Sequence, residues 1–173
     1  MKQEFHERIK RLEDLHELQQ LRARYCQALD DGRWQELAEL FTPDGAFVGL
    51  STARGHEELR TFFADLQKGA LTAWWHFSMN ETLELDGDLA TGETWLLQPC
   101  VVDGRSQLAA GRYTDRMLRG HDGRWRFTER RVRFFWWVDL DKGWDAGRFN
   151  WSAAEAAADS RDLPEATRPE AAP

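Results

Sequence analysis

The first third of the chain repeats its apolar positions with a helical period. Between residues 5 and 29 these positions recur every three or four residues, which places them on one face of a helix: Ile9, Leu12, Leu15, Leu18, Leu21, Tyr25 and Leu29. Asp30-Asp31-Gly32 is a stop signal that ends this helix.

Two shorter helices and one short strand are expected next. The apolar pattern predicts helices over residues 34–41 and within residues 52–68, where Gly69 is the stop. Thr42-Pro43-Asp44-Gly45 is typical of a turn, and residues 46–50 then form a short strand.

After Gly69 the period changes from helical to strand-like. Four runs rich in β-branched and aromatic residues are separated by Asp-Gly sequences, which are typical of hairpins: residues 74–85, 91–102, 106–119 and 124–138. We therefore predict an α+β fold, in which three N-terminal helices pack on one face of a curved, mostly antiparallel sheet.

The composition changes again near the C-terminus. Residues 152–173 contain eight Ala and three of the five Pro. A segment of this composition is typical of a solvated tail. We expect one globular domain over residues 1–151, followed by an acidic, Ala- and Pro-rich tail over residues 152–173.

Charge and cysteine content exclude several classes of function. The formal net charge of −7 disfavours a nucleic-acid partner. No apolar run approaches the roughly 18 residues of a membrane span, and the charged N-terminus lacks the apolar region of a secretory signal, so we expect a cytoplasmic protein with no membrane partner. The two cysteines, Cys26 and Cys100, suit a reducing compartment as buried thiols, and no Cys/His cluster predicts a metal site.

Aromatic residues are the unusual part of the composition. Nine Trp and ten Phe cannot all be solvated, so most must line a core, an interface or a pocket. In a strand, Phe134-Phe135-Trp136-Trp137 presents one Phe and one Trp on each face. We expect Phe134 and Trp136 to contact a substrate, together with Trp74, and the other face to be covered by a partner subunit or by residues 144–151.

Four segments carry a resemblance to a known family. Tyr25-Cys26-Gln27-Ala28-Leu29-Asp30-Asp31-Gly32-Arg33-Trp34, residues 40–45, residues 111–116 and residues 122–127 together resemble the SnoaL-like families of the nuclear transport factor 2-like superfamily. The resemblance covers about residues 7 to 140. It implies a cone-shaped α+β barrel that encloses an apolar pocket. It also implies a homodimer or homotrimer formed through the sheet.

Within that superfamily, the scytalone dehydratase-like group resembles this chain at Asp30 and at His76, in Trp74-Trp75-His76-Phe77. Bile-acid 7α-dehydratase and hexachlorocyclohexane dehydrochlorinase are similar in using a His base at the same place. The resemblance implies that His76 is a general base inside the cone and that Asp30 orients it. Imidazole suits the removal of a proton from carbon near neutral pH, and a carboxylate on its other nitrogen selects the tautomer. Such a site needs no metal and no cofactor.

The chain also departs from scytalone dehydratase. That enzyme's second His falls at Cys100, and its pocket tyrosines fall at apolar positions near Leu29 and Val48, so its exact chemistry is not expected. The proton donor is therefore open between Tyr25 and Arg130, near positions where dehydrochlorinase-like enzymes carry polar pocket groups.

Each candidate has a purely structural interpretation as well. Tyr25 shares the apolar stripe of the first helix and could be an ordinary core tyrosine. Strand alternation groups Arg130 with Arg124 and Arg126, as on a solvated edge. Asp31 could replace Asp30 if the register differs by one residue.

Three functions remain open at this level. The first is a cofactor-independent lyase that removes water, formaldehyde or halide from a hydrophobic aromatic or polycyclic substrate. The second is an isomerase or cyclase that uses the same base. The third is a non-catalytic ligand-binding or assembly module, comparable to the β subunit of a ring dioxygenase. An ordered hydrogen bond between Asp30 and His76 inside a closed pocket would argue against this third function.

Overall fold

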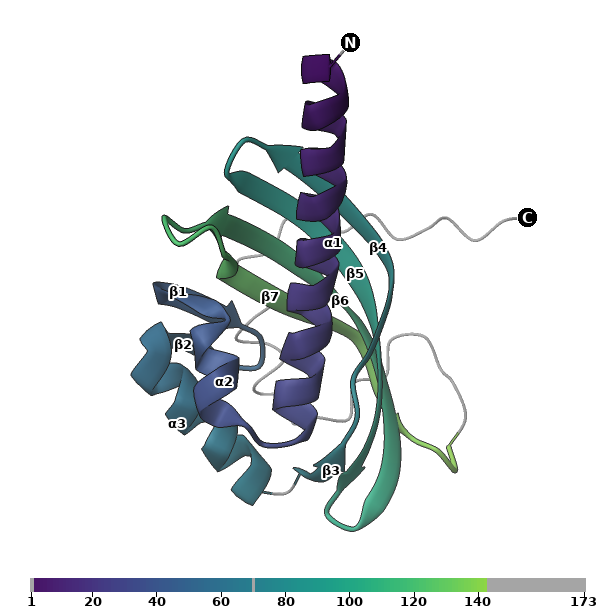
Figure 1. Cartoon of the computed structure of the whole chain (residues 1–173). Coiled ribbons are helices and arrows are strands. Elements are labelled where there is room, and N and C mark those ends of the chain that lie inside the picture. Colours follow the sequence, from purple (N-terminus) through teal and green to yellow (C-terminus); the bar gives the residue numbers. More distant parts are fainter. Residues whose placement is uncertain (1, 70, 143–173) are drawn as a thin grey trace, which may run out of the picture.

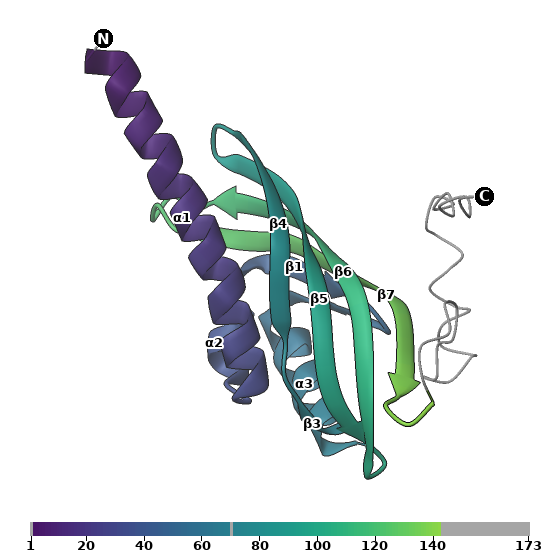
Figure 2. The same ribbon diagram turned by 90° about the vertical axis from the view of Figure 1, so that its right-hand side faces the viewer.

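A long helix lies across a strongly curled sheet, and two shorter helices lie beside its C-terminal end (Figures 1 and 2). The computed structural model describes residues 2–69 and 71–142. In this part of the chain the helices are α1 (Lys2–Asp30), α2 (Trp34–Glu39) and α3 (Gly55–Lys68). The strands are β1 (Phe41–Val48), β2 (Thr52–Arg54), β3 (Leu71–Trp74), β4 (Phe77–Asp86), β5 (Leu89–Val102), β6 (Arg105–Arg119) and β7 (Trp125–Asp139).

The sheet confirms the predicted α+β class. Within the described residues it has seven strands in the order β2-β1-β7-β6-β5-β3, and β4 also pairs with β5. The antiparallel series from β4 to β7 is the predicted meander. The short strand β1 joins its far edge in parallel with β7, so the sheet is mostly antiparallel, as expected.

The predicted turn at residues 42–45 is instead an irregular part of β1. Phe41 pairs with Phe127 and Ala46 pairs with Glu129, so β1 has more residues than β7 between these two pairs. The Pro-Asp-Gly sequence therefore bulges out of the strand without reversing the chain. The second helix accordingly ends at Glu39, before the expected boundary.

The apolar stripe of α1 is covered along only part of its length. Leu18, Leu21 and Tyr25 are fully or almost fully buried against the sheet. Ile9 and Leu12, on the same predicted stripe, are exposed because the first turns of α1 project beyond the sheet (Figure 1).

Strand β7 changes its inward-facing positions twice, at two irregularities in its pairing with β6. One lies between the pairs formed by Arg116 and Met117, and the other lies between the pairs formed by Ala110 and Gly111. Each extra residue on β7 reverses which side chains face the core. Up to Trp137, the buried side chains of β7 accordingly run from odd to even and back to odd positions: Trp125, Phe127, Arg130, Val132 and Trp137.

Two expectations based on strict alternation are therefore wrong. Arg130 does not share a face with Arg126, because Arg130 is wholly buried whereas Arg126 pairs with Asp122 near the surface. Phe134 and Trp136 do not share a face either. Phe134 pairs with Gly111 and Trp136 pairs with Ala110, and these are adjacent residues that point to opposite sides of β6.

The opposite face of the sheet carries exposed aromatic and apolar side chains. Trp95 contacts Phe135 with 5.5 Å between ring centroids, and the Arg112 guanidinium lies 4.4 Å from the Trp95 ring. Phe77 and Met79 are exposed on β4. The homodimer or homotrimer expected through this sheet stays a prediction.

Two predicted features lie outside the described residues. These are the tail over residues 152–173 and the covering segment over residues 144–151. None of the helices described here is both long enough and apolar enough to span a membrane.

The second irregularity of β7 depends on a glycine in β6. A Cβ atom on Gly111 would lie 2.5 Å from the carbonyl oxygen of Arg133, a backbone atom that cannot rotate away. We expect Gly111→Ala to lower the free energy of unfolding by about 2 kcal/mol through overpacking. Urea denaturation measures the change. Gly69→Ala is the control, because its Cβ would make only an ordinary 3.5 Å contact with Leu66. Equal stability of the two variants would contradict the packing argument.

Candidate active site

The expected Asp–His pair is present in the structure. Nδ1 of His76 lies 2.5 Å from Oδ1 of Asp30, and the backbone N–H of His76 donates to Oδ2 of Asp30 at 3.1 Å. The carboxylate therefore holds both the ring and the main chain of His76. Asp31, the alternative residue, is exposed and pairs with Arg33, so the register that selects Asp30 is the observed one.

Local backbone geometry explains why this carboxylate faces the sheet. The helix ends at Asp30 because Gly32 adopts a positive φ of 69°, and the N–H of Arg33 donates to the carbonyl of Ala28 at 2.8 Å. The indole of Trp74 then donates to the carbonyl of Leu29 at 3.2 Å. This bond ties β3 to the last turn of α1, so His76, two residues after Trp74, meets Asp30.

His76 lies in the wall of a cavity between the helices and the sheet. The space between its walls, including the open mouth, is about 440 Å³. Its apolar walls include the side chains of Phe47, Leu71, Trp74, Val132, Phe134 and Trp137. The structure thus brings Trp74 and Phe134 to the cavity, as expected, and places Trp137 there in the position predicted for Trp136.

Tyr25 reaches the same cavity from α1. Its side chain is completely buried, and its hydroxyl has no hydrogen-bond partner in the described part of the chain. Burial raises the pKa of this phenol well above its usual value, so the hydroxyl remains protonated near neutral pH. Tyr25 therefore lines the cavity with a protonated hydroxyl that makes no hydrogen bond within the described residues.

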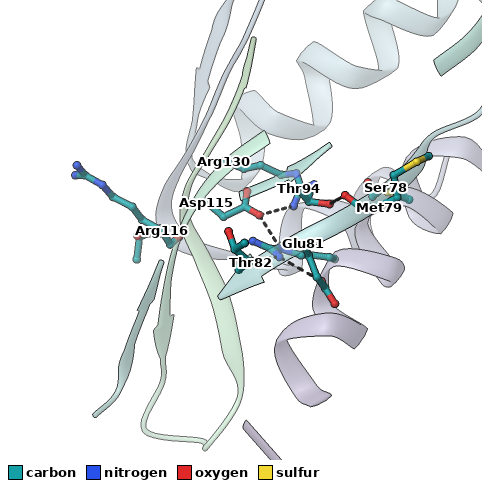
Figure 3. Close-up of polar contacts among 11 residues, drawn as sticks. Ser78, Met79, Glu81, Thr82, Thr94, Asp115, Arg116 and Arg130 are labelled. Carbon is teal, nitrogen blue, oxygen red and sulfur yellow. Dashed lines mark hydrogen bonds and ion pairs between the residues drawn. The ribbon is translucent and has the colours of Figure 1, made fainter. Parts of the chain in front are cut away.

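Arg130 lies behind the cavity wall, among aromatic rings. Its guanidinium carbon is 4.3 Å from the ring of Tyr25 and 3.8 Å from the ring of Tyr113. Nη1 of Arg130 donates to Asp115 at 3.2 Å, and the same carboxylate oxygen accepts a 2.9 Å hydrogen bond from Nε of Arg22 (Figure 3). Arg130 is thus a buried cation that supports the tyrosines, rather than an arginine on a solvated edge.

The sequence reasoning missed two polar residues of the cavity, Gln98 and Tyr113. Gln98 is buried on β5 beside Leu97, which pairs with Phe77, the residue after His76. A single amide inside the apolar run Trp95-Leu96-Leu97-Gln98 was the signal available in the sequence. Tyr113 belongs to the Gly111-Arg112-Tyr113 motif. Only the alternation of inward- and outward-facing residues along its strand indicates that Tyr113 faces inward.

Neither cysteine is placed as a nucleophile. Burial raises the pKa of Cys100 to about 12, so its thiol is protonated near neutral pH. Burial also raises the pKa of Cys26, whose sulfur lies 3.2 Å from the Ser78 hydroxyl. Across the described residues, no group of three or more His, Cys, Asp or Glu side chains is arranged to hold a metal ion.

Comparison with known proteins establishes the family. The SnoaL-like domain model matches residues 10–131, which is more than half of the chain, so the chain belongs to the SnoaL-like domain family, as predicted. A relative is the uncharacterized protein Rv2910c of Mycobacterium tuberculosis, which is 29% identical over 129 residues, covering 70% of this chain and 86% of that protein.

Solved structures show the same fold. Hexachlorocyclohexane dehydrochlorinase LinA-type3 of Novosphingobium barchaimii LL02 is similar with a TM-score of 0.71 and 22% identity, over 80% of this chain and 97% of that one. A variant of Rv3472, a protein of unknown function from Mycobacterium tuberculosis, is similar with a TM-score of 0.69 and 27% identity, over 87% of this chain and 86% of that one.

The support of Arg130 by Asp115 has a consequence for stability. Asp115→Asn would leave the buried guanidinium of Arg130 without a counter-charge and would leave Arg22 with Glu81 as its remaining ion-pair partner, so we expect it to lower the free energy of unfolding by about 3 kcal/mol in urea denaturation. Glu93→Gln is the control, because Glu93 pairs with Arg112 at the surface, where an ion pair contributes at most about 1 kcal/mol. An Asp115→Asn protein as stable as this control would contradict the role given to the carboxylate.

Proposed function

We propose that this protein is a cofactor-independent lyase that removes water, or a similar small leaving group such as formaldehyde or halide, from a hydrophobic aromatic or polycyclic substrate. The observation that carries the proposal is the hydrogen bond between His76 and Asp30 in the wall of an aromatic-lined cavity. An assembly module has no need for a base oriented in this way inside a pocket, so the geometry argues against the non-catalytic alternative.

In the proposed reaction, His76 acts as the general base. Asp30 accepts a hydrogen bond from Nδ1–H of His76, so that Nε2 is the unprotonated nitrogen and can remove a proton from a substrate carbon. As the imidazolium forms, the neighbouring carboxylate stabilises its charge. The side chain of His76 is only 5% exposed, and exclusion of water strengthens this electrostatic effect.

Of the two candidate proton donors, Tyr25 and Arg130, the geometry supports Tyr25 better. In the loss of water or halide, the electron pair of the broken C–H bond forms a C=C bond, the bond to the leaving group breaks, and the leaving group takes the phenol proton. In the loss of formaldehyde, His76 instead removes the O–H proton of a hydroxymethyl group. The O–H pair then forms the C=O bond of formaldehyde, the C–C bond breaks, and the carbon that keeps its electron pair takes the phenol proton. Tyr25 lines the cavity, whereas Arg130 lies behind its ring and binds Asp115. Arg130 therefore serves this reaction as a positioned charge.

An isomerase or cyclase is the second candidate function, because the same pair of residues, His76 and Asp30 (the dyad), can move a proton without expelling a group. The phenol of Tyr25 favours the lyase, since a leaving hydroxide needs a proton. Product mass separates the two reactions, because an isomerase leaves the mass of the substrate unchanged.

The dyad generates the first functional prediction. Aryl and polycyclic compounds with a β-hydroxy, hydroxymethyl or β-halo group are screened by mass spectrometry for loss of water, formaldehyde or hydrogen halide. On the best substrate, we expect His76→Ala and Asp30→Asn each to lower kcat/KM by about 10²–10⁴-fold. Asp31→Asn is the matched control and should retain full activity, because Asp31 faces solvent. Nearly full activity in both dyad variants would refute the mechanism.

The proposed proton donor, Tyr25, generates the second functional prediction. Tyr25→Phe removes the acid while keeping the ring, so we expect it to slow the loss of water by about 10²-fold. The loss of halide should be much less affected, because halide leaves without a proton. The ratio of the two rates, measured on a matched pair of substrates, is the readout. An equal effect on both leaving groups would show that Tyr25 only shapes the cavity.

A further inference from the structure

The proposed reaction leaves one amide of the cavity without a role. Gln98 lies on β5, is 3% exposed and lines the cavity. Its inward-facing neighbours on the strand, Leu96 and Cys100, are apolar. The Gln98 side chain makes no hydrogen bond within residues 2–69 and 71–142, so the fold does not use the amide. The amide is therefore available to a molecule that enters the cavity.

Gln98 lies next to the proposed base. Phe77, the residue after His76, pairs with Leu97, the residue before Gln98. Because this pairing is antiparallel, the chain leads from it to His76 and to Gln98 in the same direction. Both side chains line the cavity. A substrate with a C–H bond against His76 thus has another part of its surface against Gln98.

The cavity wall offers no counter-charge to an ionic ligand. None of the Lys, Arg, Asp and Glu side chains in the described part of the chain lines the cavity. Arg130 lies behind the wall and is paired with Asp115, and Asp30 is hydrogen-bonded to His76. A carboxylate or phosphate in the cavity would be buried without a partner, which is strongly unfavourable. The cavity therefore favours uncharged ligands.

An amide in an apolar wall recognises one kind of uncharged group. The side chain of Gln98 offers two N–H donors and a carbonyl acceptor, so it can bind a group that donates, accepts or does both. A ligand that displaces water from an amide must reproduce those hydrogen bonds or bind less tightly. A substrate without a polar group at this place is therefore disfavoured.

We propose that Gln98 determines substrate specificity by binding an uncharged polar substituent that the reaction retains, a hydroxyl or a carboxamide near the reacting C–H bond. This inference rests on the proposed function and narrows its substrate to neutral compounds that carry such a group. Hydrocarbon frameworks whose only substituent is the leaving group are outside this class, and so are aryl carboxylates.

Three fluorinated probes of similar size test the selection without turnover, because the ¹⁹F resonance of each probe reports its binding. They are 4-fluorophenol, 4-fluorotoluene and 4-fluorobenzoate. The readout is the dissociation constant of 4-fluorotoluene divided by that of 4-fluorophenol. We expect Gln98→Met to lower this ratio about tenfold, because Met keeps the length of the side chain and removes its hydrogen bonds. The wild-type protein should bind 4-fluorobenzoate at least about tenfold more weakly than 4-fluorophenol.

Gln20→Met is the matched control, because Gln20 is exposed on α1, and it should keep the wild-type ratio. An unchanged ratio in Gln98→Met overturns the proposal, and so does a wild-type protein that binds 4-fluorobenzoate as tightly as 4-fluorophenol or binds no 4-fluorophenol. These results do not depend on turnover. Full activity of His76→Ala and Asp30→Asn would refute the lyase, whereas the probe ratio would still decide the role of Gln98.

Thermal unfolding separates this role from a structural one. Replacing an amide that the fold does not use by an apolar side chain is neutral or stabilising. We expect ligand-free Gln98→Met to have the same Tm as the wild-type protein or a higher one, although its probe ratio falls. A Tm lower by more than about 4 °C would show that the fold uses the amide, and would overturn the proposal.

Nuclear magnetic resonance keeps the test valid if Gln98→Met does not fold. The side-chain NH₂ signals of Gln98 in the wild-type protein are assigned through its own backbone. We expect saturating 4-fluorophenol to shift these signals as the amide gains a partner, and 4-fluorotoluene to shift them much less. Equal responses to the two probes would contradict the proposal.

Discussion

A guanidinium buried among aromatic rings is the constraint on which the rest of this structure depends. Arg130 is wholly buried between Tyr25, Tyr113 and Phe127, and a charge in such a place is tolerated only with a partner. Asp115 provides that partner from the adjacent strand. Because Asp115 also binds Arg22, the same carboxylate ties the middle of α1 to the sheet. The position of α1 in turn sets where two side chains of the proposed site lie.

Those side chains are Tyr25 and Asp30, five positions apart on one helix. Tyr25 packs on the buried cation, whereas Asp30 ends the helix and holds His76 at the start of β4. One rigid element thus carries the proposed acid and the residue that orients the proposed base. The apolar cavity wall provides packing and excludes water, and the few polar groups in it provide the chemistry, a division typical of small-molecule sites.

Local signals in the sequence were sufficient for most of the architecture. The change from helical to strand-like period after Gly69 predicted the order of helices and hairpins, and Asp-Gly turns marked the meander. They failed at Pro43, where the turn sequence lies within β1. The reason is that pairing with β7 at both ends of the segment overrides its local preference for a turn.

The sequence by itself determined the family, the class of fold and the residue types of the site, because period, turn chemistry and short motifs are properties of neighbouring residues. The tertiary structure alone decided that Arg130 is buried, that Trp137 lines the cavity where Trp136 was expected, and that Tyr113 joins the site. The assignments of Arg130 and Trp137 depend on two irregularities in β7, each of which reverses the inward-facing positions. A bulge arises from the fit between two strands, so neither strand's own sequence reveals it.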